Sequence, residues 1–156
     1  EDLDEQKCEI YTTSQLKEQT VAENADKKLP VYIFKNGVTV IPCYGAGLWG
    51  PIWGYIGVDN TDYTTITKAC FGHKGETPGL GAKITDEPAV FADKFHGKHV
   101  GKFSVAKNVD ATDLSAVNAI SGATITSQAV GTALNQWFGF YKNYFAKKRP
   151  ADGLNN

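Results

Sequence analysis

Residues 121–127 read Ser121-Gly122-Ala123-Thr124-Ile125-Thr126-Ser127, a run of small and hydroxylated residues around one glycine. Directly after this run, large apolar side chains recur at steps of three and four residues, at Val130, Leu134, Trp137, Phe138, Tyr141, Tyr144 and Phe145. This spacing predicts a long amphipathic helix with one buried, aromatic face. Basic residues at 147–149 suit the negative end of the helix dipole, and Pro150 marks the end of the helix.

Upstream of this helix, several short segments are rich in β-branched and aromatic residues. β-rich runs bounded by turn residues predict strands at 31–34, 38–44, 52–58, 63–71 and 102–106. The Asn36-Gly37 pair between the first two strands is a strong hairpin signal. We expect a short helix around Leu16, and a short helix or coil over 86–95. The sequence therefore predicts an α+β fold, a twisted antiparallel sheet flanked by helices, with a long amphipathic C-terminal helix.

The bulk composition indicates one globular domain over residues 1–156. The chain is 42% hydrophobic and has a net charge of −1, with no sustained basic face, so nucleic acid is not an expected partner. Apolar stretches are interrupted well short of the roughly 20 residues that a membrane span needs. No signal-peptide pattern opens the chain, and the tail 151–156 is expected to fray.

The cysteine and histidine spacings do not predict a metal site. Cys8, Cys43 and Cys70 form no Cys-x-x-Cys pair, so neither an iron–sulfur nor a structural zinc site is expected. At most one internal disulfide can form among them; otherwise they are small buried hydrophobes. His96 and His99 have metal-like spacing but no third ligand nearby, which favours ordinary surface positions.

The run at 121–127 has the residue types of an anion site. Unpaired amides at a helix N-terminus attract negative charge, and Gly122 lets a ligand approach the backbone closely. A threonine hydroxyl there could be esterified by a phosphate, whose free oxygens Thr126 and Ser127 could hydrogen-bond. The simpler alternative is that Ser121 or Thr124 only caps the helix.

Three motifs together resemble the FMN-binding domain family, over roughly residues 40–140. Ser121-Gly122-Ala123-Thr124 resembles the family's flavinylation motif, in which the last threonine carries FMN through its phosphate. Gly75-Glu76-Thr77-Pro78-Gly79-Leu80-Gly81 is similar to a second signature loop. A third match begins at Gly47-Leu48-Trp49 and runs to Tyr55. One departure is Asn118, which stands three places before Ser121 where the family's motif carries an acidic residue.

The resemblance implies a set of FMN-binding residues, with Thr124 as the covalent attachment point. The set comprises Ser121, Gly122, Ala123, Thr124, Thr126, Glu76, Thr77, Gly79, Leu80, Leu48 and Trp49. Leu80 would contact the isoalloxazine ring, and Glu76 and Thr77 the ring edge or ribityl chain. Taken alone, Thr77-Pro78-Gly79 is an ordinary turn. Trp49 is expected near the flavin, and Trp53, inside a strand, in the core.

The resemblance also implies a function. The family occurs in the C subunit of the sodium-translocating NADH:quinone reductase, whose Gly-Leu-Trp the chain shares, and in the G subunit of the related Rnf complex. It implies a one-electron carrier with covalent FMN and no catalytic residues of its own, loaded by a flavin transferase. Its partners would be the other subunits of a membrane complex that carries electrons to quinone and transports sodium.

The same resemblance implies a location. An N-terminal membrane helix, absent from this chain, would hold the domain on the periplasmic side of the inner membrane. Two other kinds of protein stay open, a small flavin reductase with dissociable FMN and a non-redox domain that binds a lipid or another subunit.

Overall fold

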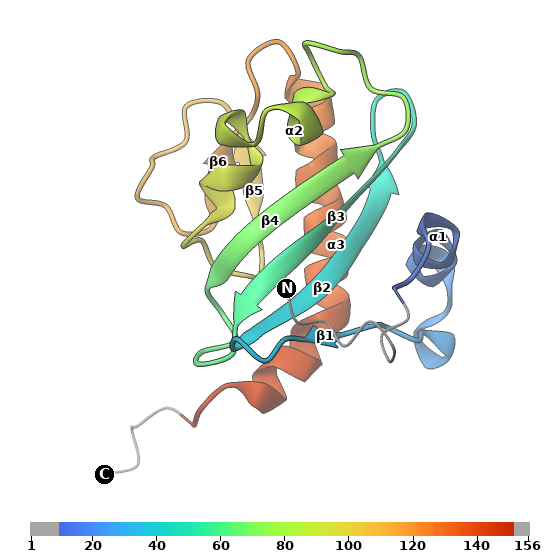
Figure 1. The fold of residues 1–156 in the computed structure, drawn as a ribbon, viewed down its shortest axis with the longest axis vertical. Helices are drawn as coiled ribbons and strands as arrows, with labels where there is room; N and C mark the ends of the chain where they lie inside the picture. Colours follow the sequence, from blue (N-terminus) through green and yellow to red (C-terminus); the bar gives the residue numbers. More distant parts are fainter. Residues whose placement is uncertain (1–9, 152–156) are drawn as a thin grey trace.

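The computed structural model describes residues 10–151, which form an α+β fold around one four-stranded sheet. The strands follow the order β1-β2-β3-β4 and all pair antiparallel. The elements are α1 (Thr13–Val21), η1 (Asn24–Asp26), β1 (Tyr32–Ile33), β2 (Val38–Ala46), β3 (Pro51–Asp59), β4 (Ile66–His73), α2 (Lys83–Asp86), η2 (Pro88–Val90), η3 (Ala92–Phe95), β5 (Ser104–Ala106), β6 (Ala116–Asn118) and α3 (Thr124–Lys148). Figure 1 shows α3 running along one face of the sheet, with α1 beside the β2 edge.

The long hairpin of β2 and β3 is the centre of the sheet. Its register runs without interruption from Val38 opposite Asp59 to Ala46 opposite Pro51. Alternate residues of both strands point toward α3, and these are fully or almost fully buried, at Ile41, Cys43, Ile52 and Ile56. The predicted strands 38–44 and 52–58 are confirmed, each extended by a residue or two. The strand expected at 63–71 begins later, at Ile66, because Tyr63 has a positive φ of 49° and belongs to the turn.

Helix α3 confirms the predicted amphipathic helix, and its aromatic face packs on the sheet. Six of the seven residues in the predicted face are buried, while Tyr144 is half-buried. The Trp137 indole N–H donates to the Tyr44 carbonyl at 3.0 Å. At Gly45 an added Cβ would lie 2.8 Å from Cβ of Ala133, so helix and strand approach too closely for a side chain there. This close packing fixes the position of α3, and therefore of its N-terminus, relative to the sheet.

A second, two-stranded sheet was not predicted. β5 and β6 pair parallel, with Ser104 opposite Ala116 and Ala106 opposite Asn118. The strand expected at 102–106 corresponds to β5, whereas the sequence around β6 was assigned to no element. β6 is only three residues long, which leaves no periodicity for a sequence pattern to reveal. The sheet packs against α3 through Gly131, where an added Cβ would lie 2.9 Å from Cγ2 of Val105.

Of the cysteines, Cys43 is buried and Cys70 is exposed, and both are free thiols. Burial raises the pKa of the Cys43 thiol to about 12. The expectation of a small buried hydrophobe is therefore confirmed for Cys43 and wrong for Cys70. Cys8 and most of the tail expected to fray lie outside the described residues. Within residues 10–151, no helix has both the length and the apolar character to cross a membrane.

Candidate functional site

Four chain segments line an open cavity of about 480 Å³ at one end of the molecule. They are the β2–β3 turn, the loop between β4 and α2, the residue that follows β5, and the start of α3. Figure 1 shows the β2–β3 turn, α2 and the start of α3 at the same end of the fold. The cavity is lined by Leu48, Trp49, Glu76, Thr77, Leu80, Gly81, Lys107, Gly122, Ala123, Thr124, Ile125 and Thr126.

Thr124 is the first residue of α3, and its side chain lies at the cavity. The residue is half-buried, and its hydroxyl makes no hydrogen bond to any of residues 10–151. Ala123 holds the N-cap position and no side chain caps the helix. The alternative that Ser121 or Thr124 only caps α3 is therefore wrong. The stretch 124–127, which the sequence pattern placed before the helix, is the first turn of the helix.

The backbone at the start of α3 presents unpaired donors. The Ser127 amide donates to the Ala123 carbonyl, which begins the helical ladder. Consequently the amides of residues 124, 125 and 126 have no acceptor within the described chain. Gly122 has a φ of +79°, a conformation that glycine adopts without strain, and this turns the chain into the helix. Free amides and the helix dipole together favour an anion at this point.

Ser127, expected to bind phosphate oxygens, is instead a structural residue. Its side chain is fully buried and its hydroxyl is engaged on both sides. It accepts from the Ile120 amide at 2.9 Å and donates to the Ala123 carbonyl at 2.8 Å. Ser127 therefore holds the 120–123 turn against the helix and has no hydrogen left for a ligand. Thr126 is also buried, yet it lines the cavity as the prediction requires.

Glu76 joins two walls of the cavity. Its side chain is 4% exposed; Oε1 accepts from the Leu48 amide at 2.7 Å and Oε2 from the Trp49 amide at 3.3 Å. Its own amide donates to Nδ1 of His73 at 3.1 Å, so the half-buried His73 helps to hold this loop. An added Cβ at Gly47 would lie 2.0 Å from Oε1, which makes this carboxylate position possible only beside a glycine. Glu76 thus shapes the site by fixing the β2–β3 turn.

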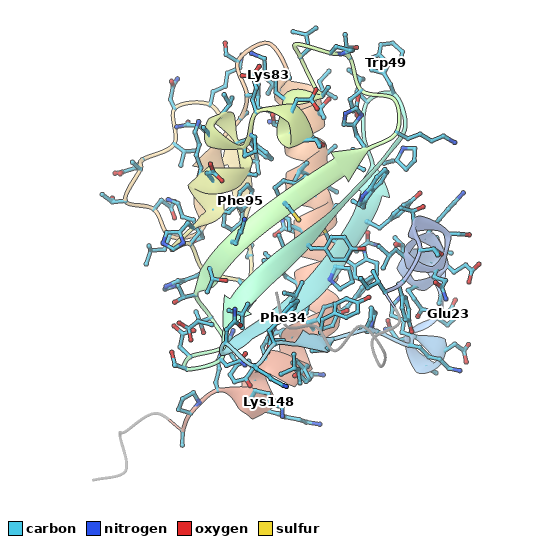
Figure 2. All side chains as sticks on the ribbon, in the orientation of Figure 1. Glu23, Phe34, Trp49, Lys83, Phe95 and Lys148 are labelled. Carbon is cyan, nitrogen blue, oxygen red and sulfur yellow. The ribbon has the colours of Figure 1, made fainter. Side chains whose placement is uncertain are left out.

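Exposed apolar side chains form the rim of the cavity, at Leu48, Trp49, Leu80 and Ile125. Trp49 is 68% exposed and lies at the tip of the β2–β3 turn (Figure 2). The core position expected for Trp53 is wrong. Trp53 is half-buried on the outer face of the sheet, where its indole lies over Gly72 and leaves no room for a side chain there.

Most of the predicted binding residues meet at this one cavity. Among them, Ser121 and Gly79 are not in its lining. Three further residues that were not predicted do line it, Gly81, Lys107 and Ile125. Gly81 and Ile125 stand inside the recognised motifs, whereas Lys107 belongs to none and follows a three-residue strand. Within the described chain, no three His, Cys, Asp or Glu side chains are grouped to hold a metal ion.

Asn118, the departure from the family motif, makes a specific bond. Its Oδ1 accepts from the Val109 amide at 2.8 Å, which links the end of β6 to the loop that follows Lys107. We expect Asn118→Ala to lower the free energy of unfolding by about 1 kcal/mol, because it removes this acceptor. Asn118→Asp retains an acceptor oxygen and serves as the matched control. Urea unfolding of both variants measures the difference, and equal losses would contradict a role for the acceptor.

Several known proteins are similar to this chain in sequence. The FMN-binding domain family model matches residues 47–139. The C subunit of the Na(+)-translocating NADH-quinone reductase from Pasteurella multocida is 35% identical, over 81% of this chain and 52% of that protein. The C subunit from Haemophilus ducreyi is 30% identical, over 83% of this chain and 54% of that protein. The chain spans about half the length of these curated relatives.

Solved structures are similar as well. The C subunit of the same reductase from Parabacteroides distasonis matches with a TM-score of 0.67 and 40% identity, over 78% of this chain and 64% of that one. Shewanella oneidensis NqrC matches with a TM-score of 0.65 and 31% identity, over 76% of this chain and 58% of that one. At these identities the likeness extends beyond the fold to the sequence.

Proposed function

This chain belongs to the FMN-binding domain family, and we propose that it carries FMN as a phosphoester on Oγ1 of Thr124 and relays electrons. The observation that carries the proposal is the unbonded Thr124 hydroxyl beside three unpaired helix amides in a single cavity. A hydroxyl that keeps no internal hydrogen bond is free to be esterified without disturbing the fold.

The residues present fit an FMN group. A cavity of about 480 Å³ lies within the range of small-molecule sites. Its α3 end offers amide donors and the positive end of a helix dipole, which suit a phosphodiester with one negative charge. Its opposite walls offer Trp49 and Leu80, which suit a flat, largely apolar ring. Gly47 and Gly81 let the walls of the cavity pack closely on one another, since an added Cβ at either would clash with Glu76 or Thr126.

The protein's contribution is position and environment, because FMN itself supplies the one-electron chemistry when bound. The start of α3 would hold the phosphate, and Glu76 would keep the 47–50 turn in place beside the ring. The exposed rim at Leu48, Trp49 and Ile125 leaves one side of the site open to a redox partner. A carrier of this kind needs no nucleophile–base pair, and we assign no catalytic residue.

For the whole protein, we propose the role of the relatives named above, the C subunit of a Na+-translocating NADH:quinone reductase. Its partners would be the other membrane subunits, and a flavin transferase would load it. An N-terminal membrane helix would place this domain on the periplasmic side of the inner membrane. The shared Gly47-Leu48-Trp49 favours this assignment over the G subunit of the Rnf complex.

Whole-protein mass spectrometry of protein produced alongside a flavin transferase tests the proposal. Ester formation joins Oγ1 of Thr124 to phosphorus, and the threonine proton leaves with the displaced group, AMP if the donor is FAD. We therefore expect a mass gain of FMN less one water, and no gain without the transferase. Flavin released into an acid supernatant would instead indicate dissociable FMN, and protein that takes up no flavin would favour a non-redox domain.

A further inference from the structure

We propose that Lys107 is an additional binding residue for the esterified phosphate, with its ammonium group opposite the negative charge of the diester. This inference rests on the proposed function and names a residue outside the family motifs that the sequence matches. Lys107 lines the same cavity as Gly122, Ala123 and Thr124. Among the residues in that lining it is the only cation, and Glu76 is the only acid.

The charge of Lys107 is not committed elsewhere. Across residues 10–151 the ammonium group of Lys107 has no hydrogen-bond acceptor and no ion-pair partner. Lys83 also belongs to this end of the molecule (Figure 2). It differs from Lys107 because its ammonium group pairs with Glu87 at 3.6 Å. The two carboxylate oxygens of Glu76 already accept the amides of Leu48 and Trp49. The lining therefore holds one acid whose oxygens are bonded to the β2–β3 turn and one cation, Lys107, without a partner among residues 10–151.

The backbone around Lys107 is held on both sides, so its side chain starts from a defined point. On the preceding side, the Ala106 carbonyl accepts from the Ala119 amide at 2.9 Å. On the following side, the Val109 amide donates to Oδ1 of Asn118. Between them Asn108 has a φ of +54°, a left-handed turn that asparagine tolerates better than most residues. Strand β6, which ends at Asn118, leads through residues 119–123 directly into α3.

This arrangement explains why a lysine belongs here. Amides and the helix dipole supply partial charges only, whereas the diester keeps one full negative charge. Lys107 is exposed, so its contribution is screened by solvent and falls as salt rises. We therefore expect an effect of a few-fold on loading, much smaller than the loss caused by removing the attachment oxygen.

The effect of Lys107 on loading is measured as the rate at which the protein gains the mass of FMN in the presence of the transferase. Lys107→Gln should slow loading about fivefold at low salt, and the difference should shrink at about 0.5 M salt. Lys107→Arg should restore most of the rate. The matched control is Lys102→Gln, which removes the same charge just before β5, where the side chain lines a different groove. A Lys107→Gln rate equal to that of Lys102→Gln would overturn the inference.

A second measurement separates phosphate binding from contact with the transferase. The melting temperature of each variant is compared with and without attached FMN. If Lys107 binds the diester, the gain in Tm on flavinylation should be smaller in Lys107→Gln than in the wild type and Lys102→Gln. An unchanged gain together with slow loading would assign Lys107 to the transferase and overturn the inference. A wild-type protein that never gains the FMN mass would overturn the proposed function itself. Because the wild type is loaded in parallel with the variants, this failure is distinguished from a failure of the Lys107 inference.

Discussion

Replacing Thr124 by valine is expected to abolish covalent FMN completely while leaving the fold intact. Valine keeps the β-branched shape but lacks the oxygen to which the phosphorus is joined. The Thr124 hydroxyl has no hydrogen-bond partner in residues 10–151, so its removal orphans no buried group. We therefore expect the free energy of unfolding to change by less than about 0.5 kcal/mol. Acid precipitation after production with the transferase should give a colourless pellet, and the mass should equal that of the unmodified chain.

Thr126→Val is the matched control for this loss. Thr126 stands two residues further along the same helix turn and also lines the cavity, but its side chain is almost fully buried. It should still gain the mass of FMN less one water, at a reduced rate if its hydroxyl contacts the phosphate. A Thr124→Val protein that stayed yellow in the acid pellet would show that the attachment residue is another one.

Replacing Trp137 by alanine is expected to destabilise the domain by about 3–5 kcal/mol. Trp137 is fully buried; its ring lies at centroid distances of 5.3 Å from Phe140 and 6.4 Å from Tyr141. Its indole also donates to the Tyr44 carbonyl, so alanine leaves both a cavity and an unpaired acceptor on β2. A loss of this size is a large fraction of the total stability of a typical domain. Urea unfolding followed by far-UV circular dichroism measures it without relying on tryptophan fluorescence.

Two variants divide this effect into its parts. Trp137→Phe keeps an aromatic ring and loses the hydrogen bond, so we expect a smaller loss of about 1–2 kcal/mol. Trp49→Ala removes the same side chain from the exposed tip of the β2–β3 turn and should change stability by less than about 0.5 kcal/mol. If Trp49→Ala destabilised the fold as much as Trp137→Ala, the division between a core indole and a site indole would be wrong.

The elements with strong local signals could be predicted from the sequence. The aromatic side chains at steps of three and four residues required a helix, because only that period brings them onto one face. Alternation similarly required the strands β2 and β3, and the Asn36-Gly37 turn required the hairpin of β1 and β2. β6, and with it the small parallel sheet that it forms with β5, could not be predicted, because a strand of three residues carries no period. Trp53 was misplaced because alternation shows that a strand has two faces but not which face α3 covers.

The candidate site also has features that the sequence predicted and features that only the tertiary structure shows. The sequence by itself determined the family, the signature loops and Thr124 as the candidate attachment residue, because these depend on residues adjacent in the chain. Only the tertiary structure decided that Glu76 holds the amides of Leu48 and Trp49, that Ser127 is engaged internally, and that Lys107 reaches the same cavity. A local sequence pattern predicts the conformation of a single turn. Contacts between residues tens of positions apart depend instead on how the helix packs on the sheet, as the close approach of Gly45 to Ala133 illustrates.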